Sequence, residues 1–412
     1  MVQKSRTGIR LALLSVFVTL IVARGAAQDW PQWRGVNRDG AISSFREPSS
    51  WPEGLKQQWK VDVGLGYATP LLVGDRLYLF SRQGADEVMS ALDPVSGKTI
   101  WRTSYPAPFE VMSAAVRHGA GPKSTPTYAN GRLFTLGMTN IVTAFDAATG
   151  KQLWQKPATK AQPLYHTAMS PLVEGNSVIV HTGGAGETAL AALDVATGNA
   201  RWTWSGDSPA YGSPIVVDLG GTRQVVTFTH RNMVGIAVAD GRLLWQRPFV
   251  TASDTTSQTP ILYRDMLIQA GRGNGITAFR VVRRDDTWAT EDVWQTKDVS
   301  LHMTNGVVVD GVLYGLSHLN SGQYFALDLS TGMPLWKSDP RQAENAAMVR
   351  AGNTIFSLQD DGVLLVLKAS RSALDVVRRY SVATSATWTQ PTISGNRLYV
   401  KDISTLALWT LN

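Results

Sequence analysis

The sequence of 412 residues contains no cysteine. This absence excludes disulfide bonds, thiolate metal ligands and a lipid attachment site on a cysteine side chain. No Lys/Arg-rich run occurs either, so nucleic acid is not an expected partner. After residue 27 no apolar run is long enough to span a bilayer. The fold must therefore be held by a hydrophobic core, which 44% hydrophobic residues can supply.

The motifs of several enzyme classes are missing as well. There is no GxSxG nucleophile elbow and no HExxH zinc motif. Glycine-rich stretches at 183–186 and 271–275 lie where β-hairpins should turn, and no helix follows them. A phosphate-binding loop needs that helix, so this interpretation fails.

Residues 1–27 have the pattern of a secretory signal peptide. Three basic residues precede an apolar run at 11–22, and Gly25-Ala26-Ala27 offers small residues for cleavage. We predict an exported chain that begins at Gln28 and is periplasmic or secreted; the alternative is a single membrane anchor. Removal of this segment lowers the formal charge from +7 to +3, because it carries four cations and no acid.

An N-terminal extension at 28–56 follows, with the motif WPQWRG at 30–35. Its prolines, glycines and charges argue against a long helix or strand. Two tryptophans so close together need a place to be buried. We predict a strap over the main domain, with Trp30 and Trp33 as plugs and Arg34 as an internal hydrogen-bonding partner; the alternative is a ligand-contacting loop.

One phrase recurs along the rest of the chain, as in AFDAATGKQLW at 144–154. The Asp can accept hydrogen bonds from amides just ahead and open a turn, and the Gly takes the positive φ that the turn requires. Apolar residues on both sides complete a β-hairpin. A Trp follows the Gly by four positions in five copies, and we predict a structural role for the repeat tryptophans Trp101, Trp154, Trp202, Trp245, Trp294 and Trp336.

The period of the phrase predicts the fold. Closing aromatic residues recur from Trp59 to Tyr380 at a mean spacing of about 46 residues, which is typical of four strands per propeller blade. Seven units are complete, and residues 389–411 have room for three strands of an eighth. We predict an all-β, eight-bladed β-propeller of four-stranded antiparallel blades at 57–412. Its ring closes where the N-terminal strand around Trp59 pairs with the C-terminal strands, which removes the open sheet edge.

The AxDxxTGxxxW phrase and the eight-fold count resemble the repeat of the pyrroloquinoline quinone (PQQ)-type β-propellers, over essentially all of 29–412. That superfamily includes the quinoprotein alcohol dehydrogenases and the outer-membrane assembly factor BamB. The resemblance implies the fold strongly and the function only weakly.

A dehydrogenase resembling its family would need Ca²⁺, acidic and amide ligands, flat residues around the quinone and often a vicinal cysteine pair, which is absent here. Aligning the units on the proline that stands at the start of the first strand shows what converges on the axis. Neither the position one residue before it nor the position three before it contains a carboxylate in any unit. The nearest acids are Asp254 and Glu344. We therefore expect no cofactor and no metal, with PQQ and calcium as the alternative.

The same alignment brings aromatic and basic residues to one mouth of the channel. We predict a ligand- or partner-binding funnel; the alternative is that these side chains merely plug a solvent-filled channel. The candidate residues are Tyr67, Lys123, His166, Tyr211, His302 and Trp388. Aromatic surfaces with a few polar groups suit sugars, peptides or extended chains.

The function we predict is an exported, non-catalytic binding or scaffolding propeller of the bacterial envelope, BamB-like, monomeric, with envelope proteins or glycans as partners. One alternative is a PQQ-dependent dehydrogenase, which should show acidic ligands in the funnel. The other is a carbohydrate-binding or carbohydrate-active propeller, which should show an aromatic platform built from Tyr67, Tyr211 and Trp388.

Overall fold

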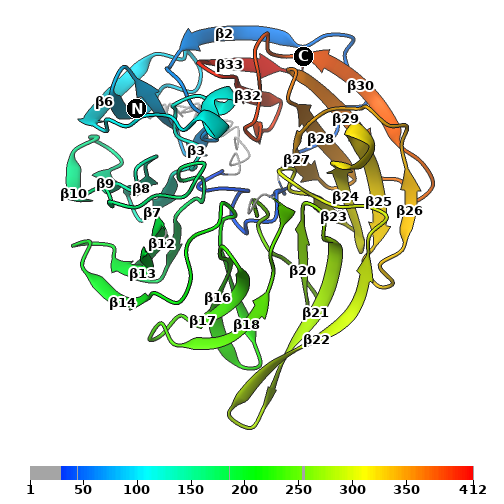
Figure 1. Cartoon of the computed structure of the whole chain (residues 1–412). Coiled ribbons are helices and arrows are strands. Elements are labelled where there is room, and N and C mark those ends of the chain that lie inside the picture. The colour runs from blue at the N-terminus through cyan, green and yellow to red at the C-terminus, as the bar shows by residue number, and fades with distance from the viewer. Residues whose placement is uncertain (1–28, 44, 185, 253–255, 412) are drawn as a thin grey trace, which may run out of the picture.

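The computed structural model describes residues 29–43, 45–184, 186–252 and 256–411. In this part of the chain, eight antiparallel sheets stand as blades around a central axis (Figure 1). The eight-bladed β-propeller predicted from the repeat is confirmed. The predicted signal peptide at 1–27 lies outside the described residues.

Each blade runs from its innermost strand near the axis to its outermost strand at the rim. Blades one to four contain β3 (Leu71–Val73), β4 (Arg76–Gln83), β5 (Asp86–Leu92) and β6 (Thr99–Pro106); β7 (Thr127–Ala129), β8 (Arg132–Leu136), β9 (Val142–Asp146) and β10 (Gln152–Lys156); β11 (Leu172–Glu174), β12 (Ser177–Gly184), β13 (Glu187–Asp194) and β14 (Ala200–Trp204); and β15 (Ile215–Leu219), β16 (Thr222–Phe228), β17 (Asn232–Ala237) and β18 (Leu243–Pro248).

Blades five to eight repeat the arrangement. They contain β19 (Ile261–Tyr263), β20 (Met266–Gly271), β21 (Gly275–Arg284) and β22 (Thr287–Thr296); β23 (Val307–Val309), β24 (Val312–Ser317), β25 (Gln323–Asp328) and β26 (Pro334–Lys337); β27 (Ala346–Ala351), β28 (Thr354–Gln359), β29 (Val363–Lys368) and β30 (Asp375–Ser381); and β31 (Thr392–Ser394), β32 (Arg397–Lys401), β33 (Thr405–Thr410) and β2 (Lys56–Asp62). Among the described residues, the 3-10 helices η1 (Ser113–His118) and η3 (Leu319–Ser321) lie in loops.

The ring closes in the eighth blade, as the repeat count predicts. β2 is the outermost strand of this blade and pairs antiparallel with β33, with Lys56 opposite Thr410 and Trp59 opposite Leu408. The early strand β2 and the last strand, β33, therefore lie side by side in one sheet (Figure 1). β2 covers the outer edge of β33, so the strand that the C-terminal repeat lacks comes from the N-terminal side.

The turns follow the predicted chemistry. In blade two, the Asp146 carboxylate accepts hydrogen bonds from the backbone N–H and the hydroxyl of Thr149. Gly150 has a φ of +73° and donates its N–H to the Asp146 carbonyl. The glycine is required here because the turn places it in the left-handed region.

The repeat tryptophans join neighbouring blades. The ring of Trp101 lies against Gly150 of the next blade, and its indole N–H donates to the carbonyl of Ala147 there at 3.1 Å. Four others donate to a turn carbonyl in the next blade: Trp154, Trp202, Trp294 and Trp336.

Trp245 differs because blade five has no Asp-Gly turn to receive it. Its indole N–H donates to Gln224 in its own blade, and its ring packs edge-on against Phe279 at 5.9 Å.

The core consists of apolar layers between adjacent blades. In one layer, Tyr78 and Phe80 of β4 pack with Leu133 of β8 and Phe145 of β9, and all four are buried. Each blade is thus covered on both faces by its neighbours. In the described residues, no helix is both long enough and apolar enough to cross a membrane.

Candidate functional site

The N-terminal extension crosses one end of the central channel. Its first part, residues 29–43, is called the strap below, and its blue trace lies across the middle of the ring in Figure 1. Trp30 forms a β-bridge with Leu72 of blade one, and β1 (Ala41–Ile42) pairs in parallel with β27 of blade seven. The strap therefore runs from the first blade across the axis to the seventh.

Two buried arginines fasten the strap to the inner ends of the blades. Arg34 donates to the carbonyls of Asn305 and Gly306 in blade six and to two carbonyls within the strap. Arg38 donates to the carbonyls of Pro214 and Pro171 in blades four and three. Burial lowers the pKa of Arg34 to about 10 and that of Arg38 to about 9. Backbone carbonyls are the partners of both cations, and the strap is consequently part of the folded core.

The strap also forms the floor of a cavity. The indole N–H of Trp33 donates to the Thr259 hydroxyl at 2.9 Å, and the Trp33 ring lines the cavity from below. The cavity has a volume of about 740 Å³, within the range of ~300–1,000 Å³ for ligand pockets. We call this cavity the funnel. The strap thus packs into the core, and it also contributes a wall of the cavity.

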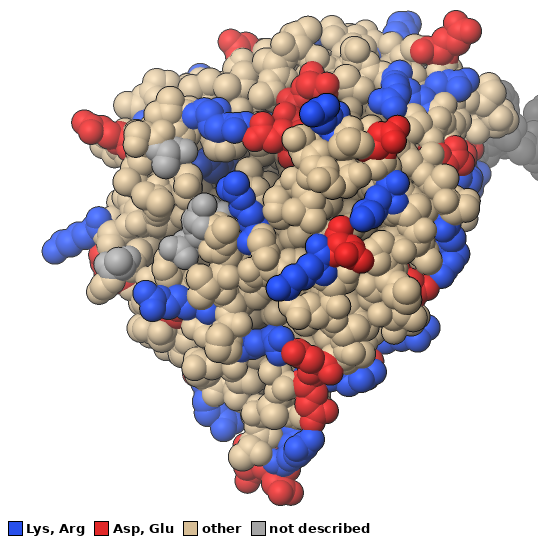
Figure 2. All heavy atoms as spheres, turned by 45° about the vertical axis from the view of Figure 1, so that its right-hand side comes forward, with Lys and Arg blue, Asp and Glu red and all other residues tan. Residues whose placement is uncertain are grey.

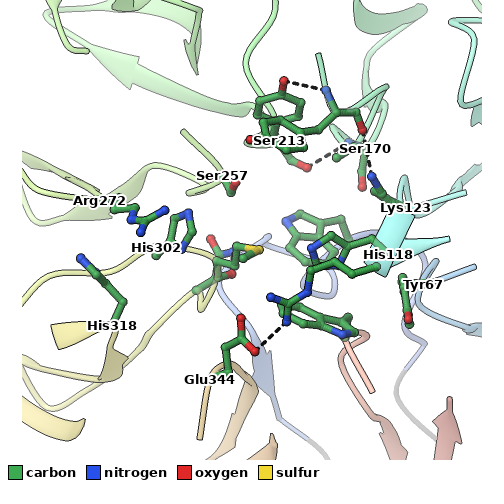
Figure 3. Close-up of a pocket in the computed structure, with 18 of the residues that line it drawn as sticks. Tyr67, His118, Lys123, Ser170, Ser213, Ser257, Arg272, His302, His318 and Glu344 are labelled. Carbon is green, nitrogen blue, oxygen red and sulfur yellow. Dashed lines mark hydrogen bonds and ion pairs between the residues drawn. The ribbon is translucent and has the colours of Figure 1, made fainter. Parts of the chain in front are cut away.

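Five of the six candidate residues line the funnel: Tyr67, Lys123, Tyr211, His302 and Trp388. They come from blades one, two, four, six and eight. Tyr67, Lys123, Tyr211 and Trp388 each lie four positions before the first strand of their blade, and His302 lies five positions before β23. Figure 3 shows Tyr67 and Lys123 on one side of the funnel and His302 on the other.

His166 is the exception. It is only 4% exposed and does not line the funnel. Its imidazole packs edge-on against Phe109 at 4.7 Å, with Nδ1 3.2 Å from the Gln162 side chain, and its Nε2 accepts a long hydrogen bond of 3.4 Å from Met112 N–H. Its φ of +60° turns the side chain into this contact. His166 therefore braces the two long loops that follow blades one and two.

Residues two positions before several of the first strands link neighbouring blades at the base of the funnel. Thr125 N–H donates to Ser170 Oγ, and Ser170 N–H donates to Ser213 Oγ, both at 2.9 Å. Thr69 N–H donates to Thr125 Oγ1 and Thr259 N–H to Asn305 Oδ1 in the same way. These side chains hold neighbouring blades in register around the axis.

The aromatic residues do not form the single platform that a carbohydrate site would require. Tyr67 and Trp388 meet edge-to-face, with ring centroids 6.5 Å apart at 61°. Tyr211 instead packs edge-on against Tyr165 at 5.7 Å, and its hydroxyl accepts the Tyr165 N–H. The rings thus form two separate pairs, and within each pair the two rings meet at a steep angle.

Several polar residues of the funnel escaped the sequence alignment. Arg117 and His118 lie on η1 in the long loop after blade one, and Arg272 and His318 directly follow the second strands β20 and β24. In an antiparallel blade, the end of the second strand lies beside the start of the first. Aligning the ends of the second strands would have identified Arg272 and His318. The loop conformation that places Arg117 has no such sequence signal.

The funnel contains more positive than negative charge. Arg117 forms an ion pair of 2.6 Å with Glu344, and its guanidinium lies 5.8 Å from the centroid of the Trp388 ring. Lys123 donates to the Tyr165 carbonyl at 2.8 Å. Arg272 lies beside His302 on the opposite wall (Figure 3). Among the described residues no carboxylate is within ion-pair distance of Lys123 or Arg272.

This environment keeps the histidines neutral. Burial, with repulsion from Lys123 and Arg117, lowers the pKa of His118 to about 4. Burial, with repulsion from Arg272 and His318, lowers the pKa of His302 to about 4 as well. Burial alone lowers the pKa of Lys123 to about 8. At neutral pH the fixed charges of the described funnel are therefore those of three cations and Glu344.

The donor set does not fit a calcium-bound quinone. Ca²⁺ takes six to eight oxygen ligands, usually with several carboxylates. Glu344 is the single carboxylate among the described residues that line the funnel, and it is paired with Arg117. No group of three or more His, Asp or Glu side chains suited to a metal ion occurs in the described part of the chain. Asp254, the other acid considered from the sequence, lies outside the described residues.

Fold and site together define the class: an eight-bladed propeller with a basic, aromatic-lined funnel that is closed at one end by its own N-terminal strap. The chain belongs to the family described as outer membrane protein assembly factor BamB, whose family model matches residues 84–338.

The similar proteins agree with this assignment. The chain is 24% identical to BamB of Yersinia pestis over 316 residues, covering 74% of this chain and 66% of that protein. It is 26% identical to BamB of Burkholderia pseudomallei over 351 residues, covering 75% and 86% respectively. The quinohemoprotein alcohol dehydrogenase ADHIIG of Pseudomonas putida HK5 superposes with a TM-score of 0.66 at 14% identity, over 93% of this chain and 80% of that structure, which shows a shared fold alone.

Proposed function

We propose that this protein is an exported, BamB-like binding module of the bacterial envelope, and that it engages a protein partner through the face on which the funnel opens. Membership of the BamB family supports the proposal, as do relatives whose names describe them as assembly factors of outer membrane proteins. The funnel offers a surface for recognition, and its donor set does not support calcium-dependent redox chemistry.

One geometric observation carries the choice of face. The loops after blades one and two present exposed apolar side chains beside the funnel residues: Met112 is 44% exposed, Val116 62% and Leu164 49%. Val116 precedes Arg117 in the sequence, and Leu164 precedes Tyr165, so each of these two exposed residues is next in the chain to a residue of the funnel wall. Apolar groups clustered around a cavity mark an interaction site on an otherwise polar surface.

Site-specific photo-crosslinking in the native cells tests the proposal. A photoreactive amino acid replaces Val116 or Leu164 in one set of strains and Asp285, at the tip of the β21–β22 hairpin, in the control. We expect a discrete adduct with an envelope protein from the two funnel-face positions and none from position 285. Absence of any adduct from both funnel-face positions would contradict the proposal.

Fractionation of the same cells tests the location. We expect the protein in the periplasmic or membrane-associated fraction, with residues 1–27 removed. A full-length protein found with cytoplasmic markers would exclude an envelope role.

A further inference from the structure

The funnel has an excess of positive charge that the face shown in Figure 2 does not have. On the face shown in Figure 2, basic and acidic side chains alternate. The funnel instead gathers Arg117, Lys123 and Arg272 around a single described carboxylate, Glu344. In a cavity with low-dielectric walls, cations of one sign focus the field and attract anions. The interior of the funnel is therefore complementary to negative charge.

Hydrogen-bond donors in the funnel wall lack acceptors. The Tyr67 side chain is 5% exposed, and its hydroxyl has no hydrogen-bond partner among the described residues. The hydroxyl oxygens of Ser170 and Ser213 each accept one backbone N–H group, and each O–H remains a donor that can turn toward a ligand. Buried polar groups are usually paired, so these atoms indicate that a ligand rich in acceptors completes the site.

The shape and the rim of the funnel restrict the ligand further. Trp33 closes the floor, so a chain that enters must turn and leave by the same mouth. Around the mouth, Met112, Val116 and Leu164 are exposed, and so is Leu65, two residues before Tyr67. A free small anion would contact the interior and leave these apolar side chains in water. A polypeptide loop with acidic residues at its tip and apolar residues beside them would cover both.

We propose that the funnel binds an acidic loop of a protein partner, whose carboxylates lie between Lys123 and Arg272 and whose flanking apolar side chains pack on Leu65, Met112, Val116 and Leu164. This inference rests on the proposed binding function and specifies the chemistry of the partner. Carboxylates on cationic donors make charge-assisted hydrogen bonds, and the apolar rim adds area that is removed from water.

Fluorescence anisotropy with labelled, disulfide-cyclised peptides tests the inference. The probe has three glutamates at the turn and two leucines on each side. One comparison peptide has glutamines in place of the glutamates, and another has serines in place of the leucines. We expect saturable binding of the probe, at least about 10-fold weaker binding of the glutamine peptide and a weaker interaction for the serine peptide. Equal affinity for the glutamate and glutamine peptides would overturn the inference.

Variants locate the binding. Arg272→Gln should lower the affinity for the probe by about 10-fold. Arg283→Gln, on the exposed hairpin of the same blade, should leave the affinity unchanged. Lys123→Gln should weaken binding, and Lys123→Arg should restore it by retaining the charge. Matching melting temperatures show that each variant is folded. Unchanged affinity in a folded Arg272→Gln variant would place the acidic peptide elsewhere and refute the inference.

Two further outcomes separate this inference from others. If citrate displaces the probe and the serine and leucine peptides bind equally, the funnel is a site for small anions, and the proposal of a protein loop falls. If no peptide binds while positions 116 and 164 still crosslink to an envelope protein, the acidic-loop inference fails and the proposed function stands. If neither peptide binding nor crosslinking from positions 116 and 164 is observed, the proposed function fails as well.

Discussion

The indole N–H of Trp33 donates to the hydroxyl of Thr259 at 2.9 Å, across 226 residues of sequence. This bond joins the strap to the inner end of blade five and seals the floor of the funnel. A propeller of this kind would otherwise have a channel along its axis. The protein instead has a blind cavity, and the ligands it can accept are those that enter and leave by one mouth.

Replacing Arg34 should show how much the strap contributes to stability. Arg34 is 2% exposed and donates to four carbonyls. We expect Arg34→Met to lower the free energy of unfolding by about 3 kcal/mol or more, because buried acceptors left without donors cost ~1–3 kcal/mol each. Urea denaturation measures the change. Arg46→Met, at an exposed position, is the control and should cost less than ~0.5 kcal/mol. Equal effects would mean that the strap is not part of the cooperative fold.

The tryptophan-on-glycine contact between blades predicts a difference between two glycines that both have positive φ. A Cβ at Gly150 would lie 2.4 Å from Cε3 of Trp101, whereas one at Gly74 would meet nothing within 4 Å. Gly74→Ala should cost only backbone strain, about 1 kcal/mol. Gly150→Ala should lower the free energy of unfolding by about 1–3 kcal/mol more than Gly74→Ala does, because the indole of Trp101 must move from its site. Thermal melting of both variants checks this, and similar melting temperatures would contradict the docking role.

Removing β2 tests ring closure. Deletion of residues 57–63 exposes the edge of β33 and leaves the eighth blade with three strands. We expect a large fall in melting temperature or a failure to fold, because the layers between blades depend on a closed ring. Wild-type melting of the deletion variant would disprove the closure.

Lys401 should make stability depend on alkaline pH. Its side chain is fully buried and donates to the carbonyls of Gly64, Asp402 and Ile403, and burial lowers its pKa to about 8 from the ordinary 10.5. Between these pH values the unfolded chain keeps the proton that the folded chain loses. Stability attributable to this group therefore rises as pH increases from about 8 to 10.5.

Lys401→Met should abolish that rise. Denaturant unfolding at pH 7, 8.5 and 10 measures the difference between wild type and variant, which should change by on the order of 1–3 kcal/mol over the interval. Lys60→Met, at an exposed position of β2, is the control. A constant difference between wild type and Lys401→Met across the three pH values would show that the Lys401 proton is not linked to folding.

Titration with calcium and PQQ tests the alternative of a quinoprotein. Because the described funnel lacks a set of oxygen ligands for Ca²⁺, we expect no increase in melting temperature with calcium, alone or with PQQ. A ligand that binds the folded state would raise it by mass action. A saturable increase, followed by dye-linked oxidation of alcohols, would replace the binding proposal with an enzymatic one.

Most of the fold could be predicted from the sequence, because the interactions that define each repeat are local. The Asp-Gly turn and the Trp four residues later are interactions between near neighbours or adjacent repeats, so each copy can be recognised alone. Their spacing then determines the number of blades, and the missing strand after residue 411 requires a partner from the other end.

The site depended on tertiary structure to a greater degree. Sequence alignment could place Tyr67, Lys123, Tyr211 and Trp388 on the axis, since each has the same position relative to its first strand, and His302 adjoins that position in blade six. It could not show that Trp33 closes the cavity, that η1 carries Arg117 to Glu344, or that His166 turns away to contact Phe109. These contacts join loops of irregular conformation, and their geometry follows from packing across the ring and not from any local pattern. The repeated turns and tryptophans thus determine a propeller, whereas the three-dimensional arrangement of its strap and loops decides that the channel is a closed, basic funnel.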